Sequence, residues 1–312
     1  MDAGQFLKGP ATRTFEQAWA DDCGAAHCLS VANGTDAIEL VLRALGATGG
    51  EVITAANAGG CTTTAARLAG AVPVHFDIDP RTHCGSAAAA LALVGPRTRV
   101  VVATHLYGNL AGVAAIRAGL AAMGRNDVRV VEDCAQAHGP RAADGPVGSL
   151  AAAAAFSFHP SKNLGAPGDA GAITCGDESL HRELVALHQY GWTRRYAAER
   201  PGGRNSRMDE LQATVPLVKL PHLADWTAQR QAIVKAYADA APSALRPVTG
   251  QGPTVAHLAA RRSRSAPARA SQIPTPAATT SSWPAAAGRR RPRTPSARWP
   301  APAGCRAGRR SW

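Results

Sequence analysis

The 312-residue sequence contains no apolar run of 18 residues or more, and it therefore predicts no membrane-spanning helix. Its first residues lack a basic stretch followed by an apolar one, which argues against a secretory signal. The seven cysteines are odd in number and none forms a Cys-x-x-Cys pair, so neither a disulfide framework nor a zinc site is expected. These absences predict a cytoplasmic protein that binds no structural metal.

Acidic residues and lysine are missing from residues 261–312, which hold 12 arginines and eight prolines. Residues 1–260 carry 22 basic and 22 acidic residues, so the net charge of +12 comes from this last segment alone. A folded enzyme that binds nucleic acid is expected to carry its basic patch on the body, and the composition therefore argues against such a partner. The prolines and the unbalanced positive charge predict an extended or disordered tail.

The first 260 residues alternate short buried-type strands with alanine-rich helices, and 46% of the whole chain is hydrophobic. This alternation is typical of an α/β domain with a mostly parallel sheet flanked by helices. The predicted strands are 51–54, 72–76, 100–103, 128–131, 153–158 and 172–174, and the predicted helices are 178–189, 208–217 and 223–240.

Two segments point to the chemistry. Lys162 stands in a Ser- and Gly-rich turn after a buried strand, and Asp133 ends an earlier strand. Pyridoxal phosphate chemistry requires such a pair, because the lysine amine forms a Schiff base with the aldehyde and a carboxylate keeps the pyridine nitrogen protonated. Glu132 competes with Asp133 for this role, since only strand register separates them. A solvated lysine and an acid that caps the next helix are the ordinary alternatives.

A phosphate site is the second candidate feature. The turn Asn33-Gly-Thr-Asp36 precedes a predicted helix, whose N-terminus favours an anion. Gly34 allows a close backbone approach and Thr35 offers a hydroxyl, although an ordinary helix cap explains the same residues. Ser157 is a further candidate for the phosphate, or simply a small residue within a strand.

Three other polar residues each have two explanations. Gln136 is placed to donate to the cofactor's ring oxygen or to lie on the surface. Asn205 and Arg207 stand at the start of a predicted helix, where contacts to an anion compete with helix capping. The residues alone do not separate these alternatives.

In their order along the chain, these segments resemble the pyridoxal-phosphate-dependent sugar aminotransferases of the DegT/DnrJ/StrS family over residues 14–260. The resemblance rests on Asn33-Gly-Thr-Asp-Ala, Glu51-Val-Ile-Thr, His105-Leu-Tyr-Gly, Glu132-Asp-Cys-Ala-Gln-Ala-His-Gly, Phe156-Ser-Phe-His-Pro-Ser-Lys-Asn-Leu-Gly and Asn205-Ser-Arg-Met-Asp-Glu-Leu-Gln-Ala. It implies the fold-type I aminotransferase architecture and a homodimer with shared active sites. It also implies amino transfer from an amino acid, glutamate in the family, to a nucleotide-linked keto-deoxysugar. Such sugars serve a glycosylated metabolite or a surface polysaccharide.

The resemblance assigns roles to individual residues. Lys162 matches the catalytic Schiff-base lysine, and Asp133 matches the catalytic partner of the pyridine nitrogen. The matching cofactor contacts are Gln136 to the ring oxygen, Gly34, Thr35 and Ser157 to the phosphate, and Asn205 to the phosphate of the other subunit. The related dehydratases carry a histidine at the lysine position, so Lys162 argues against that activity.

The chain departs from the family pattern at one point within the site. Where many relatives have Asn-Thr-Phe or Asn-Thr-Tyr, it has Asn57-Ala-Gly-Gly-Cys61, and the aromatic residue that stacks on the cofactor ring is not assigned. Gly191-Trp192 and the segment 202–207 are similar to enzymes that aminate the 3-keto carbon of nucleotide-linked 6-deoxysugars.

A second departure lies near the end of the similarity. The family continues after Leu258 into a small α/β domain, where this chain has its Arg/Pro/Ala-rich segment. We therefore expect a cofactor-binding large domain in 1–245, the start of an incomplete small domain in 246–260, and a tail in 261–312. A frameshift near 259–261 is our hypothesis for the change, with a genuine basic appendage as the alternative. A catalytically impaired relative that at most binds the cofactor or the sugar nucleotide is the alternative function.

Overall fold

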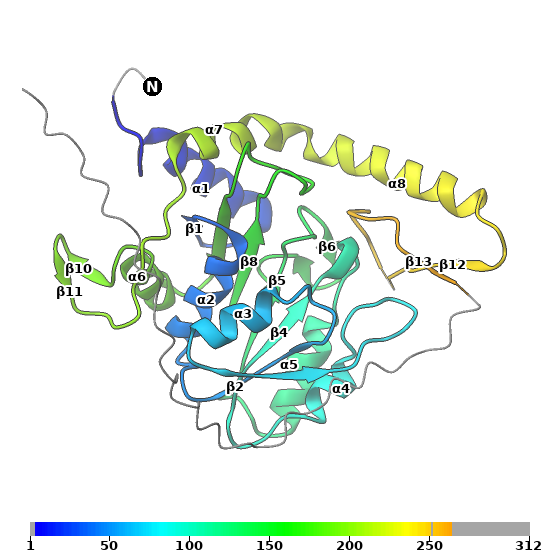
Figure 1. The fold of residues 1–312 in the computed structure, drawn as a ribbon, viewed down its shortest axis with the longest axis horizontal. Helices are drawn as coiled ribbons and strands as arrows, with labels where there is room; N and C mark the ends of the chain where they lie inside the picture. Colours follow the sequence, from blue (N-terminus) through cyan, green and yellow to red (C-terminus); the bar gives the residue numbers. More distant parts are fainter. Residues whose placement is uncertain (1–3, 251, 264–312) are drawn as a thin grey trace, which may run out of the picture. The chain divides into compact units, whose positions relative to one another are not determined.

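A seven-stranded sheet forms the centre of the computed structural model, which describes residues 4–250 and 252–263 (Figure 1). The strands follow one another across the sheet in the order β1-β9-β8-β5-β4-β2-β3. Their bounds are β1 (His27–Val31), β2 (Glu51–Ala55), β3 (Val72–Phe76), β4 (Thr98–Thr104), β5 (Arg129–Asp133), β8 (Ala153–Ser157) and β9 (Gly171–Cys175). The predicted tail from residue 264 onward lies outside the described residues.

The sheet is mostly parallel, as the sequence predicted, but one strand runs against the others. β2, β3, β4, β5 and β8 pair in parallel, whereas β9 pairs antiparallel with both β8 and β1. β1 therefore points the same way as β8, and the carboxyl ends of β1, β8, β5, β4 and β2 share one edge of the sheet. Ligands of open α/β sheets bind at this edge.

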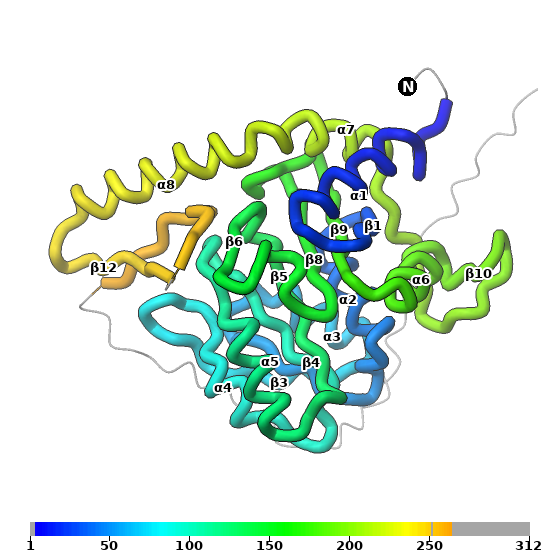
Figure 2. The backbone as a smooth tube through the Cα atoms, turned by 180° about the vertical axis from the view of Figure 1, so that it is seen from behind, coloured from blue at the N-terminus to red at the C-terminus, as the bar shows by residue number. Residues whose placement is uncertain are grey.

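Helices cover both faces of the sheet. Figure 1 shows α2 and α3 over one face, and Figure 2 shows α1 and α5 over the opposite one. The helices are α1 (Pro10–Cys23), α2 (Gly34–Ala44), α3 (Cys61–Leu68), α4 (Ala87–Leu91), α5 (Val113–Ala122), α6 (Glu178–Leu187), α7 (Glu210–Lys219) and α8 (Leu223–Asp239), with short 3-10 helices η1 (Leu106–Gly108) and η2 (Leu220–His222). Across the described residues, no helix is both long enough and apolar enough to cross a membrane.

Two hydrophobic cores follow from the alternation of side chains along the strands. Val100 and Val102 of β4 pack with Ile38 and Leu40 of α2, on the face that α2, α3 and α6 cover. Val101, the residue between them, belongs to the opposite core, which also contains residues of α1, α4 and α5. Successive side chains of a strand point to opposite faces, so a continuous run of buried valines requires helices on both sides.

The last described part of the chain leaves the sheet. α7 packs against α1. α8 then extends beyond the sheet, and of its 17 residues Leu223 is the one that is buried. The chain returns through β12 (Leu245–Pro247), which pairs antiparallel with β13 (Arg261–Ser263). The first three residues of the predicted tail thus belong to a two-stranded ribbon. Two further short ribbons pair β6 (Arg141–Ala142) with β7 (Gly145–Pro146) and β10 (Trp192–Arg194) with β11 (Ala197–Ala198).

Candidate functional site

A cavity of about 760 Å³ opens at the carboxyl edge of the sheet, and we call it the Lys162 cavity. The turns after β1, β2 and β4 and the ends of β5 and β8 contribute to it. Of the residues predicted from the sequence, it is lined by Gly34, Thr35, Asp133, Gln136, Ser157 and Lys162. Asn205 does not line it: this residue is exposed, in a bridge with Gln189.

Asp133 is the last residue of β5, and its carboxylate lies in the cavity wall with 5% of the residue exposed. Its Oδ1 accepts a hydrogen bond from the backbone N–H of Ala135 at 3.2 Å, and its Oδ2 accepts one from the Thr104 hydroxyl at 3.4 Å. Burial raises the pKa of Asp133 above its ordinary value of 3.8, while the Ala135 N–H, Lys162, His105 and the Thr104 hydroxyl act in the opposite direction. A cation placed against this carboxyl group would lower its pKa and favour the charged form.

Glu132, the competing acid, points to the opposite face of β5 and is fully buried. Its carboxylate accepts hydrogen bonds from the backbone N–H groups of Gly148 and Leu150 and from Nε2 of His105, at 3.2, 2.9 and 3.1 Å. Strand alternation thus assigns the cavity to Asp133. Cys134 lies close enough to His105 and Glu132 for the three to hold a cation. The carboxylate already has three donors, however, and His105 Nδ1 accepts from the N–H of Ala111 at 3.0 Å, so these contacts explain the cluster.

Lys162 reaches the cavity from the loop between β8 and β9. Its backbone N–H donates to the carbonyl oxygen of His159 at 2.8 Å, which closes a tight turn immediately before the lysine. Burial lowers the pKa of the Lys162 ammonium below its ordinary 10.5, and Asp133 and Cys61 act in the opposite direction. A lowered pKa makes the neutral amine more available at moderate pH, which is what a nucleophilic lysine requires.

The start of α2 and the end of β8 form a close contact at the cavity. A Cβ atom on Gly34 would lie 2.7 Å from the Cβ of Ser157, so only glycine allows this approach. The side chain of Asn33 caps the helix by accepting the N–H of Asp36 at 2.8 Å. The helix cap and the anion site were alternatives in the sequence, but here the cap uses Asn33 while Gly34 and Thr35 face the cavity at the helix N-terminus.

Gln136 has a fixed orientation in the wall of the cavity. Its side-chain oxygen accepts a hydrogen bond from the backbone N–H of Tyr107 at 2.7 Å. The side-chain nitrogen therefore points away from this N–H and can donate to another group. Tyr107 itself has φ of 60°, a left-handed conformation that is uncommon for a residue with a side chain.

Tyr107 and Thr104 line the cavity but were not predicted as site residues. Thr104 is the last residue of β4, and Tyr107 follows that strand. β4 lies beside β5, so their position at the carboxyl end of a strand was the signal in the sequence that could have identified them. The unassigned segment after β2 contributes Asn57, Ala58, Gly59 and Cys61 to the lining, without an aromatic ring. Tyr107 and His159 are the residues with an aromatic ring among the described lining residues, so these two are the candidates to stack on a bound ring.

Helix capping, one of the two explanations that the sequence left open for Asn205 and Arg207, does not apply. α7 begins at Glu210 with Asp209 at its N-cap, so both residues precede the helix. Ser206, between them, accepts the backbone N–H of Ala32 through its hydroxyl at 3.2 Å and thereby joins this loop to the end of β1.

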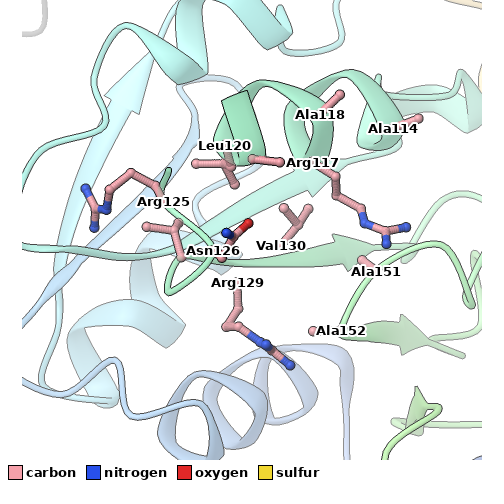
Figure 3. A pocket seen from close by; sticks show the side chains of 12 residues that line it. Ala114, Arg117, Ala118, Leu120, Arg125, Asn126, Arg129, Val130, Ala151 and Ala152 are labelled. Carbon is pink, nitrogen blue, oxygen red and sulfur yellow. The ribbon is translucent and has the colours of Figure 1, made fainter. Parts of the chain in front are cut away.

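A second pocket of about 560 Å³ lies at the opposite edge of the sheet, beside α5 and the starts of β5 and β8. It contains Arg117, Arg125 and Arg129, whose guanidinium groups point away from one another (Figure 3). Arg125 donates to Asp127 and to the carbonyl oxygens of Gly95 and Thr98, and Arg117 donates to the carbonyl of Leu150. The three cations therefore do not converge on one ligand.

Comparison with known proteins gives the same family as the sequence motifs. The chain is 41% identical over 238 residues to the erythromycin biosynthesis sensory transduction protein EryC1 of Saccharopolyspora erythraea, which covers 76% of this chain and 64% of that protein. It is 38% identical over 238 residues to the dTDP-3-amino-3,4,6-trideoxy-alpha-D-glucose transaminase of Micromonospora megalomicea subsp. nigra, covering 76% and 63%. The chain thus spans less than two thirds of the length of these relatives.

Among solved structures, the chain is similar to DesV of S. venezuelae in complex with a ketimine intermediate. The TM-score is 0.80 at 35% sequence identity, and the match covers 85% of this chain and 71% of that one. The fold-type I architecture expected from the sequence is therefore confirmed. A family model matches residues 1–266, and the chain belongs to the DegT/DnrJ/EryC1/StrS aminotransferase family.

Proposed function

We propose that this chain is a pyridoxal-phosphate-dependent aminotransferase that transfers an amino group from an amino acid to a nucleotide-linked keto sugar. The observation that carries the proposal is the position of Lys162 and Asp133, which reach one cavity from the loop after β8 and from the end of β5. The transaminase named among the relatives acts on a dTDP-linked amino sugar, which supports this substrate class. Glutamate as the amino donor and the 3-keto carbon of a 6-deoxysugar as the acceptor follow from the resemblance in sequence.

The residues around the Lys162 cavity fit this cofactor. The N-terminus of α2, with Gly34 and Thr35, and the hydroxyl of Ser157 suit a phosphate group. The amide nitrogen of Gln136 suits the ring oxygen, and the buried carboxylate of Asp133 suits a protonated pyridine nitrogen. When bound, pyridoxal phosphate supplies an aldehyde that condenses with amines and a ring that takes up electrons from the substrate carbon.

The side chains of this chain divide the remaining work. Lys162 would hold the cofactor through its Nζ, and the free amine would carry a proton between the two carbons that flank the transferred nitrogen. Its lowered pKa favours the neutral amine that this proton transfer requires. Asp133 keeps a positive charge on the ring side of the cavity, and its two hydrogen-bond donors hold the carboxylate in place.

The assembly and organisation of the chain are part of the same proposal. Because Asn205 is exposed and lies away from the cavity of its own chain, we propose that it contacts the phosphate in the partner of a homodimer. Residues 1–245 would form the cofactor-binding domain, and 246–260 the start of a second one. The six cysteines among the described residues are free thiols, which supports a cytoplasmic location.

The proposal is tested by the visible spectrum of the purified chain after addition of pyridoxal phosphate. We expect an absorption band, and amine transfer from glutamate to a dTDP-linked keto sugar, in the wild type, and we expect both to disappear in Lys162→Ala. Lys235→Ala, which removes an exposed lysine from α8, is the matched control and should keep both signals. A wild-type chain without a lysine-dependent band would sink the proposal. A band without amine transfer would indicate a protein that only binds the cofactor.

A further inference from the structure

A network of hydrogen bonds fixes residues 254–257 against the Lys162 cavity. We call these residues the 254–257 segment; they lie in sequence beyond α8, in the part predicted to begin a second domain. The segment contacts the cavity on two sides, and no residue of it was predicted from the sequence to belong to the site. One set of contacts reaches Asn163, the residue after Lys162, and the other reaches Tyr107, whose N–H donates to Gln136.

The first set involves Asn163, the residue after Lys162. Its side-chain nitrogen donates to the carbonyl oxygen of Val255 at 3.0 Å, and its side-chain oxygen lies 2.7 Å from Nδ1 of His257. Because the amide nitrogen is used by Val255, the amide oxygen must accept, and His257 Nδ1 is the donor. Asn163 and His257 are both buried, with 6% and 8% exposed, so neither hydrogen bond is readily replaced by water.

The second set involves η1, which follows β4. The backbone N–H of Val255 donates to the carbonyl oxygen of Gly108 at 3.2 Å, and the N–H of His257 donates to that of Tyr107 at 3.1 Å. The N–H of Tyr107 in turn holds the side chain of Gln136. A Cβ atom on Gly108 would lie 3.1 Å from the backbone nitrogen of His257 and 3.2 Å from that of Ala256, so the two backbones are in close contact.

Two residues at these contacts have a left-handed backbone conformation, which residues with a side chain seldom adopt without support from their surroundings. Tyr107 has φ of 60° and Ala256 has φ of 47°, and the two residues lie on opposite sides of the contact. A residue with a Cβ atom persists in this region only where its surroundings fix it, and such residues concentrate at functional sites. α8 adds a further attachment, since the side-chain nitrogen of Gln231 donates to the carbonyl oxygen of Thr254 at 2.6 Å.

The ring of His257 is uncharged near neutral pH. Burial lowers its pKa from 6.5 to about 4, and the positive charges of Lys162 and Arg230 act in the same direction. A neutral ring with its proton on Nδ1 donates to Asn163 without adding a positive charge near the lysine. The ring is therefore suited to hold Asn163 in place, and it is not suited to exchange protons with the substrate.

We propose that His257 is a positioning residue of the Lys162 cavity: through Asn163 and Tyr107 it holds the lysine loop and the Gln136 wall in a fixed mutual arrangement. The role of Lys162 in this statement rests on the proposed function, whereas the hydrogen bonds that join His257 to Asn163 and Tyr107 do not depend on it. The 254–257 segment thus belongs to the cofactor site although it follows α8 in sequence.

The experiment compares His257→Asn, His257→Gln and His257→Leu in the full chain. An Asn amide nitrogen takes approximately the place of Nδ1 and can still donate to Asn163, whereas a Gln amide corresponds to Nε2 and Leu has no donor. Without cofactor, we expect the backbone amides of Tyr107 and Leu164 to exchange hydrogen about tenfold faster in the Gln and Leu variants, the effect of about one lost hydrogen bond. The Asn variant should exchange like the wild type.

With cofactor, the Gln and Leu variants should bind pyridoxal phosphate about tenfold more weakly, and the pH midpoint of their lysine-dependent visible band should shift. His222→Leu, which removes an exposed histidine before α8, is the control and should change neither quantity. If the Leu variant does not fold, the Gln variant decides, because it keeps a polar side chain of similar size. Unchanged exchange and affinity in a folded Gln variant would overturn the proposal. Faster exchange in a chain whose wild type binds no cofactor would contradict the proposed function alone.

Discussion

Asp133 and Glu132 are adjacent acids in β5 whose environments differ completely. Glu132 accepts three hydrogen bonds within the core, and Asp133 faces the Lys162 cavity with two weaker donors. Both acids could be recognised in the sequence, but their roles depend on which face of the sheet each one meets. The neighbouring strands and helices decide which face each acid meets, and the residue pattern of one strand does not show it.

Replacing each acid by its amide separates the two roles. Asp133→Asn removes the charge that we propose holds a protonated ring, and we expect the turnover number to fall by about a hundredfold to a thousandfold while the chain still folds. Steady-state kinetics of the cofactor-loaded protein measures this loss, and thermal unfolding checks the fold.

Glu132→Gln is the matched control for that prediction. Because Gly148 and Leu150 donate to different oxygens of Glu132, the glutamine places an amide N–H group against one of these N–H donors, and we expect the free energy of unfolding to fall by about 1–3 kcal/mol. If Asp133→Asn lost stability and kept its turnover number while Glu132→Gln did the reverse, the assignment of the two acids would be wrong.

Tyr107 marks a limit of prediction from sequence. The segment His105-Leu-Tyr-Gly108 was recognised as a motif, but nothing in it shows that the tyrosine adopts φ of 60°. This conformation depends on hydrogen bonds to Gln136 and to His257, which lie 29 and 150 positions further along the chain. Local preference favours the opposite conformation, and long-range contacts decide the outcome.

Among the elements, the contact between α2 and β8 depends on a single glycine. In Gly34→Ala the new Cβ would lie 2.7 Å from Ser157 Cβ and 3.3 Å from its Cα, so the helix start and the strand end must move apart. We expect the free energy of unfolding to fall by about 1–3 kcal/mol. Cofactor affinity should fall as well, because both segments line the part of the cavity that we propose holds the phosphate.

Gly176→Ala is the control, since a Cβ atom there meets no atom within 4 Å. Chemical denaturation and cofactor titration of both variants test the prediction. A Gly34→Ala protein as stable as Gly176→Ala, with undiminished affinity, would show that the close approach does not matter.

α1 is capped by a side chain from a distant element. Glu210 of α7 accepts the backbone N–H groups of Gly9, Ala11 and Thr12 at 2.8, 2.9 and 2.9 Å, and also the Thr12 hydroxyl. Burial alone raises the pKa of Glu210, but these donors together lower it below its ordinary 4.5. The carboxylate thus satisfies N–H groups that the first turn of a helix leaves without partners.

The lowered pKa gives this cap a defined pH dependence. The unfolded chain takes up a proton at a higher pH than the folded one, so the stabilisation is complete above 4.5 and is lost as pH falls through the folded pKa. Glu210→Gln should lower the free energy of unfolding by about 1–2 kcal/mol at neutral pH, and the difference from wild type should shrink in acid.

Denaturant unfolding across this pH range measures the effect. Glu183→Gln, which removes a surface ion pair with Arg200, is the control and should change stability little at any pH. A constant difference between wild type and Glu210→Gln down to the acid limit would argue against the carboxylate as the cap.

The sheet shows which elements local patterns can predict. Strands such as β3 and β4 were found because valine-rich runs bounded by turns are typical of buried strands. The antiparallel direction of β9 was not predicted from the sequence. β9 lies between β8 and β1, and its pairing with β1 joins strands about 145 residues apart in the chain. Predicted helix ends also differ from α7 by two residues, because its cap is Asp209 and not the polar residues before it.

The whole molecule determines whether Asn205 contributes to catalysis. Its side chain is exposed and does not line the Lys162 cavity of its own chain, so a phosphate contact requires a second copy of the chain. In a symmetric dimer each cavity then combines Lys162 of one subunit with Asn205 of the other. Under this proposal, the two residues belong to one site only in the assembled dimer.

Mixing two inactive variants tests this arrangement. Lys162→Ala and Asn205→Asp should each be inactive alone, the second because a carboxylate repels the phosphate. After both are unfolded together and refolded as an equal mixture, half of the dimers are hybrids, and each hybrid contains one cavity with both residues intact. We therefore expect about one quarter of the wild-type activity. If Asn205 served the cavity of its own subunit, every cavity in the mixture would lack one residue and no activity would return.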